Sequence, residues 1–110
     1  MKYVVGIIPP AALEAVQTAL GEAEIYRLTI SEVEVVHPAE EAPPGGLARG
    51  LRLEIAVNDA FLAPALAAFE AAAEVDRDGA HGSHFPVQVS VLPLEDAVRI
   101  RTGEQGPEAI

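Results

Sequence analysis

The sequence contains no cysteine and no tryptophan, and only two tyrosines and three phenylalanines occur among its 110 residues. Without cysteine, the chain has no disulfide, cysteine-ligated zinc, iron–sulfur cluster or thiol nucleophile, which suits the reducing cytoplasm. Because alanine is abundant while aromatic residues are scarce, we expect small helical faces that pack closely rather than aromatic-lined pockets. At this length we expect one domain, residues 1–110, with a sizeable core.

Basic residues are scarce too, at 7 lysines and arginines against 17 aspartates and glutamates, for a formal charge of −10. Such a balance repels nucleic-acid phosphates and anionic lipid, so we expect neither nucleic acid nor a membrane as a partner. No apolar run approaches the roughly 20 residues of a membrane span. The first residues also lack the apolar stretch of a signal peptide, so a cytoplasmic protein is expected.

The first half of the chain reads as strand, helix and strand. Tyr3–Ile8 is an apolar, β-prone run that two prolines end, and Ala11–Leu20 carries apolar residues on one helical stripe. Gly21 is expected to be the left-handed residue that ends this helix. Ile25–Val36 predicts a second strand whose alternation changes phase, so either a bulge near Ser31–Glu32 or packing on two surfaces is expected.

The second half of the chain begins with a long loop, which a strand and a helix follow. His37–Gly50 is rich in proline and glycine and predicts an exposed loop, and Leu51–Val57 alternates as a strand. Apolar residues then recur at helical spacing over Leu62–Ala73. Asn58–Asp59 offers an N-cap for this helix, and Pro64 indicates a distorted start.

A second polar loop, residues 76–86, precedes a fourth strand at Val87–Val91, a connector and a last short strand at Val98–Thr102. The resulting order, βαββαβ with an extra C-terminal strand, predicts an α+β, ferredoxin-like sandwich with both helices on one face of the sheet. Because the other face carries mixed apolar and polar residues, we expect neighbouring subunits to cover it.

Residues 91–104, VLPLEDAVRIRTGE, closely resemble the C-terminal signature of the PII nitrogen-regulatory signalling proteins. Weaker matches follow the same order along the chain, so the resemblance spans nearly all of it. They lie at Ile7–Pro10, Leu20–Ala23, Leu28–Val33, Leu53–Ile55 and Glu108–Ile110.

The resemblance implies a homotrimeric regulator, not an enzyme, that binds ATP or ADP between subunits. The expected ligand is therefore an adenine nucleotide (ATP, ADP or AMP) or another small anion. The family's long T-loop, which corresponds here to the shortened loop of residues 37–50, would dock on a regulated enzyme or transporter. Arg99 and Arg101 match the family's phosphate-contacting arginines, and Thr29 and Glu54 match positions close to the nucleotide. Two strand residues at i and i+2 share a face roughly 6 to 7 Å apart, which suits two guanidinium groups on successive phosphates; alternatively, both arginines pair with surface acids.

The sequence also departs from the family. The Gly-Asp-Gly-Lys of the family's phosphate-binding B-loop is replaced by Phe85–Gln88. Backbone N–H groups at residues 79–84, Gly82 and Ser83 among them, offer a substitute, although turn glycines explain the same pattern. The T-loop is short, has no tyrosine for uridylylation and carries Ala39 where the family's glutamine helps to hold Mg²⁺ and 2-oxoglutarate, so 2-oxoglutarate sensing is not expected.

All three histidines, His37, His81 and His84, fall in the two loops. His81 and His84 at i and i+3 suit a shared metal ion, with the plain alternative that all three are exposed without a ligand. A trimeric metal- or bicarbonate-responsive module of the CutA type is therefore the alternative function. No nucleophile-elbow, Walker or metalloprotease spacing occurs, so the residues themselves give no indication of catalysis.

Overall fold

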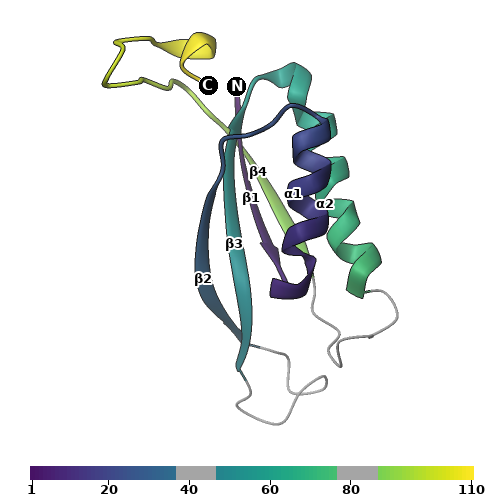
Figure 1. The fold of residues 1–110 in the computed structure, drawn as a ribbon. Coiled ribbons are helices and arrows are strands. Elements are labelled where there is room, and N and C mark those ends of the chain that lie inside the picture. Colours follow the sequence, from purple (N-terminus) through teal and green to yellow (C-terminus); the bar gives the residue numbers. More distant parts are fainter. Residues whose placement is uncertain (37–46, 77–86) are drawn as a thin grey trace.

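The computed structural model describes residues 1–36, 47–76 and 87–110. In this part of the chain a four-stranded antiparallel sheet of order β2-β3-β1-β4 carries two helices on one face (Figure 1), which confirms the expected α+β, ferredoxin-like fold. The elements are β1 (Lys2–Ile8), α1 (Leu13–Glu22), β2 (Thr29–Val36), β3 (Leu47–Val57), α2 (Leu62–Asp76) and β4 (Gln88–Pro93).

The core lies between the two central strands and the helices. Because strand side chains alternate between faces, Val4, Gly6 and Ile8 of β1 and Leu53, Ile55 and Val57 of β3 face the helical layer and are buried there. The largest fully buried side chains come from both layers: Val4, Ile8, Val16, Leu20, Leu53, Ile55 and Phe69. Burial of such side chains contributes about 1.5–3 kcal/mol each, so this layer contact dominates folding.

Helix α1 ends differently from the expectation. Gly21 lies inside the last turn of α1, and the left-handed residue is Glu24, with φ of 63°. The Ile25 amide donates to the Leu20 carbonyl over 2.8 Å, which closes the helix end and buries Ile25 in the core. A non-glycine residue in this region costs about 1–2 kcal/mol, so the tight turn is held by its surroundings.

Strand β2 begins at Thr29 rather than at Ile25, and no bulge interrupts it. Its register with β3 is continuous from Thr29 opposite Glu54 to Val36 opposite Leu47. The change of phase is nevertheless present within the strand: Ile30 lies opposite the buried Leu53, whereas Val33 and Val35 lie opposite Gly50 and Ala48 on the other side of the sheet, so β2 carries apolar residues on both faces. Strand β3 correspondingly begins at Leu47, so residues 47–50, which were expected in the loop, belong to the sheet. The rest of that loop, residues 37–46, and residues 77–86 lie outside the described part.

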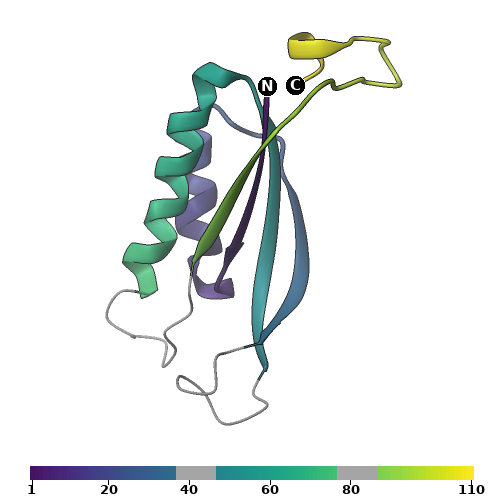
Figure 2. The ribbon, with the colours of Figure 1, turned by 180° about the vertical axis from the view of Figure 1, so that it is seen from behind.

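The prediction of a last strand at Val98–Thr102 is wrong, because no strand forms there. Val98 makes one isolated bridge to Gln105, and the chain turns between them, with Gly103 at positive φ. A strand needs a neighbouring edge, but this C-terminal arm (residues 94–110) leaves the sheet after β4, so no described strand lies beside it. The arm ends in the 3-10 turn Gly106–Ala109, at the same end of the sheet as the N-terminus (Figure 2).

One face of the sheet carries no helix among the described residues. Tyr3, Val5 and Ile7 of β1 lie on it, next to the alternate residues of β3 that end in Ala56. We refer to this surface as the open face. No helix in the described ranges is long and apolar enough to cross a membrane.

Helix α2 approaches β1 so closely that only glycine fits at position 6. A Cβ atom there would lie 2.2 Å from Phe69 Cε1, and the Phe69 ring is buried. We therefore expect Gly6→Ala to lower the free energy of unfolding by about 1–3 kcal/mol in urea denaturation. At Gly21 an added Cβ meets nothing within 4 Å, so Gly21→Ala is the control, with a gain of up to about 1 kcal/mol. Equal effects at both sites would contradict the close approach.

The N-terminal ammonium group donates to Asp59 Oδ1 over 2.9 Å. This hydrogen bond, and then the ammonium charge, lowers the pKa of Asp59 from its ordinary 3.8. A lowered folded-state pKa contributes stability that is present above about pH 4 and is lost as the pH falls through the folded value. The drop in urea midpoint between about pH 7 and pH 3 should thus be smaller in Asp59→Asn than in the wild type. Equal drops would show that the pair contributes nothing.

Candidate functional site

The C-terminal arm is tied back to the body of the protein by polar contacts. Arg99 Nε donates to the Ala109 carbonyl over 3.1 Å, and its Nη1 lies 3.5 Å from Glu104 Oε1. Asn58, expected as a helix cap, instead donates from Nδ2 to the Pro107 carbonyl over 3.2 Å. The arm therefore closes over the end of β3, and the Arg99 side chain is held in place from two sides.

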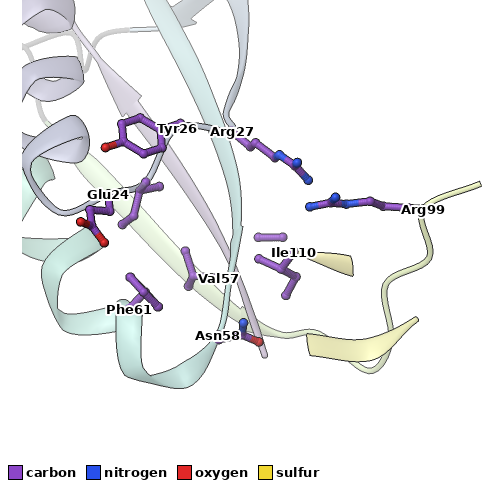
Figure 3. Close-up of a pocket in the computed structure, with 10 residues that line it drawn as sticks. Glu24, Tyr26, Arg27, Val57, Asn58, Phe61, Arg99 and Ile110 are labelled. Atoms are coloured by element: carbon purple, nitrogen blue, oxygen red, sulfur yellow. The ribbon is translucent and has the colours of Figure 1, made fainter. Parts of the chain in front are cut away.

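A cavity of about 280 Å³ lies where the arm, the α1–β2 connection and the end of β3 meet (Figure 3). Most of its wall is apolar, with two arginines on one side. It is lined by Glu24, Ile25, Tyr26, Arg27, Ala56, Val57, Asn58, Phe61, Arg99 and Ile110. Three segments that are far apart in the sequence thus build one pocket.

Arg27 and Arg99 converge at this cavity. Figure 3 shows their guanidinium groups directed toward each other beside Ile110, while the carboxylate of Glu24 lies at the opposite rim. Within residues 1–36, 47–76 and 87–110, Arg27 forms no ion pair. Two guanidinium groups that face each other create a local positive potential, and an anion relieves it.

Sequence reasoning did not find Arg27, because it stood inside a segment taken for regular strand and belonged to no motif. Its position two residues before Thr29 was the one available signal, since residues beside a predicted ligand contact are themselves candidates.

The other predicted arginine lies apart from the cavity. Arg101 is exposed in the turn that follows Arg99, and it makes no ion pair within the described ranges. Because residues 98–102 do not form a strand, the expected shared face for Arg99 and Arg101 is not present within one subunit.

Thr29 and Glu54 lie directly opposite each other on β2 and β3, on the open face. Arg52 Nη2 contacts Glu54 Oε1 at 2.8 Å. Burial raises the pKa of the Tyr3 hydroxyl, and its hydrogen bond to Glu54 raises it further. Neither Thr29 nor Glu54 lines the cavity, but Ala56, two residues beyond Glu54 on the same face, does. The pair therefore lies two residues from the cavity along β3.

The remaining predicted site residues lie outside the described part of the chain, so their roles stay predictions. They are Gly82 and Ser83 for the anion and His37, His81 and His84 for a metal ion. Among the described residues, no group of three or more histidine, aspartate or glutamate side chains is arranged to hold a metal.

Comparison with known proteins agrees with the sequence motifs. The family model described as Nitrogen regulatory protein P-II matches residues 1–104. Nitrogen regulatory protein GlnK1 of Methanosarcina mazei is 41% identical over 119 residues, which cover 100% of this chain and 97% of that protein. Nitrogen regulatory protein P-II of Azospirillum brasilense is 32% identical over 120 residues, with 100% of both chains covered. Nitrogen regulatory protein GlnK2 of Haloferax mediterranei is 32% identical over 119 residues, which cover 100% of this chain and 91% of that protein.

The family match covers far more than half of the chain, and the relatives are similar along their whole length. The resemblance first read from the C-terminal motif is thereby confirmed. This chain belongs to the nitrogen regulatory protein P-II family of signal-transduction regulators.

Proposed function

We propose that the chain forms a homotrimer, binds an adenine nucleotide at subunit interfaces through Arg99 and Arg101, and regulates a partner enzyme or transporter through the segment between β2 and β3, residues 37–46. The position of Arg99 is the main support: this residue of the family-type motif lines a cavity in which a second arginine meets it. The presence of Ala39, where the family carries glutamine, argues against 2-oxoglutarate as the effector.

Arg99 is prepared for an anion by its existing contacts. The Ala109 carbonyl and Glu104 fix the guanidinium, so little side-chain entropy remains to be lost on binding. A guanidinium keeps its charge at all physiological pH values and matches two oxygens of a phosphate at once. Arg101, exposed and without an ion pair in the described residues, is available to a ligand that reaches it from a neighbouring subunit.

The open face supports a site that a second subunit completes. Leu92 of β4 is 47% exposed beside the half-buried Tyr3 and Val5, although the helical face of the same sheet is well covered. An uncovered sheet face that carries such apolar residues among polar ones favours association between copies of a chain. Thr29 and Glu54 lie on that face, so association would bring them to the interface, where the Glu54 carboxylate can accept hydrogen bonds from ribose hydroxyls.

The proposed trimer is tested by measuring the molecular mass of the protein in solution. Light scattering should give about three times the chain mass of 11.5 kDa for the wild type. Val5→Glu places a charge at the centre of the open face and is expected to reduce the mass to that of one chain, because a buried unpaired carboxylate opposes association. Val36→Glu is the matched control at an exposed position near the far end of the sheet, and it should leave the mass unchanged. A wild-type mass of a single chain would contradict the trimer.

Nucleotide binding is tested by calorimetry with ATP, ADP and AMP. Arg101→Ala should lower the affinity for ATP and ADP by about tenfold or more, because it removes a charge-assisted hydrogen bond to phosphate. The affinity for AMP, which has a single phosphate, should change least. Arg101 is preferred to Arg99 here because Arg99 also anchors the C-terminal arm.

Arg49→Ala is the control for this experiment, since Arg49 is exposed and, in the described part of the chain, its ion-pair partner is Glu32 on the neighbouring strand β2. It should bind all three nucleotides like the wild type. Negligible heat from the wild type with every nucleotide would overturn the nucleotide-binding role.

A further inference from the structure

We propose that Arg27 is a further ligand-binding residue, which together with Arg99 forms a two-guanidinium site for one phosphate group of the bound molecule. The proposal rests on the nucleotide-binding function above and adds to it a residue outside the motifs that match the family. The apolar wall of the cavity would then contact the part of the ligand that carries the phosphate.

The backbone fixes where Arg27 lies. The left-handed turn at Glu24 reverses the chain after α1, and the buried Ile25, whose amide donates to Leu20, anchors it. Four residues after Ile25 the chain enters β2, which is hydrogen-bonded to β3 from Thr29 onward. Arg27 is therefore held between two fixed points at the end of the sheet, and its side chain extends toward Arg99 (Figure 3).

The charge distribution at this place is unlike that of the chain as a whole. The protein carries a formal charge of −10, yet two of its 7 basic residues meet here. Glu104 contacts Arg99 from the arm at a long 3.5 Å, and Glu24 lies across the cavity from both guanidinium groups. A surface arginine in so acidic a protein would be expected to pair with an acid, so this convergence favours a bound anion.

Phosphate fits this pair better than carboxylate does. One guanidinium is enough to bind both oxygens of a carboxylate. A phosphate has three acceptor oxygens and a larger charge, so it can bind two guanidinium groups at once. Ile25, Val57 and Phe61 contribute apolar wall to the same cavity, which suits a phosphate attached to a flat or apolar group. A volume of about 280 Å³ is near the lower limit for small-molecule pockets, so it suits part of a nucleotide rather than a large ligand.

The test is calorimetric titration of ADP into the wild type, Arg27→Ala, Arg27→Lys and Arg27→Glu. Arg27→Ala should lower the affinity for ADP by about tenfold, and Arg27→Glu should lower it further. Arg27→Lys should lower the affinity less, since lysine keeps the charge but loses the bidentate geometry. Arg49→Ala is the control and should bind ADP like the wild type. Because Arg27 is exposed and forms no ion pair within the described ranges, melting temperatures should stay unchanged. If the alanine variant melts early, Arg27→Gln repeats the comparison.

A second titration, with inorganic pyrophosphate, separates the two proposals. If the wild type binds ADP and the Arg27 variants bind it equally well, the role of Arg27 is overturned while the nucleotide-binding function stands. If the wild type binds pyrophosphate through Arg27 but binds no nucleotide, the phosphate site stands and the nucleotide function is overturned. If neither ADP nor pyrophosphate binds the wild type, both proposals are overturned.

Discussion

The contact between Gly6 and Phe69 is the constraint on which the rest of the structure depends. Because β1 has no side chain at this position, the Phe69 ring lies directly against the backbone of the central strand, and α2 packs at that short distance. The distance between helix and sheet then fixes where α2 begins relative to the end of β3. Phe61, which directly precedes α2, and Val57, the last residue of β3, form part of the wall of the cavity. The site thus depends on a packing contact in the core.

The cavity itself is built by connections rather than by regular elements. A left-handed turn brings Arg27 to the end of the sheet, and the folded-back arm brings Arg99. Each connection is held by backbone carbonyl or amide groups, at Leu20 for the first and at Pro107 and Ala109 for the second. The chemistry of the pocket therefore comes from loops, while the sheet and helices supply a rigid support for them.

The order of strands and helices was predictable because apolar periodicity is a local property, and the strict alternation of Leu51–Val57 survives in β3. The strand expected at Val98–Thr102 was not, because strand formation depends on a neighbouring edge that the residues themselves do not reveal. Arg99 was found through its motif, whereas Arg27 required knowledge of which distant segment lies beside it. The end of α1 was misplaced because Glu24 adopts a conformation that glycine normally provides.

Arg99 has two tasks in this structure, since the side chain that lines the cavity also holds the carbonyl of Ala109. A molecule that draws the guanidinium toward itself must therefore alter the docking of the last residues. Linkage requires the reverse as well: whatever stabilises the docked tail changes the affinity of the pocket by the same factor. If the pocket binds the proposed ligand, its occupancy and the docking of the tail are thermodynamically coupled, and a protein that bound the tail would change the affinity of the pocket.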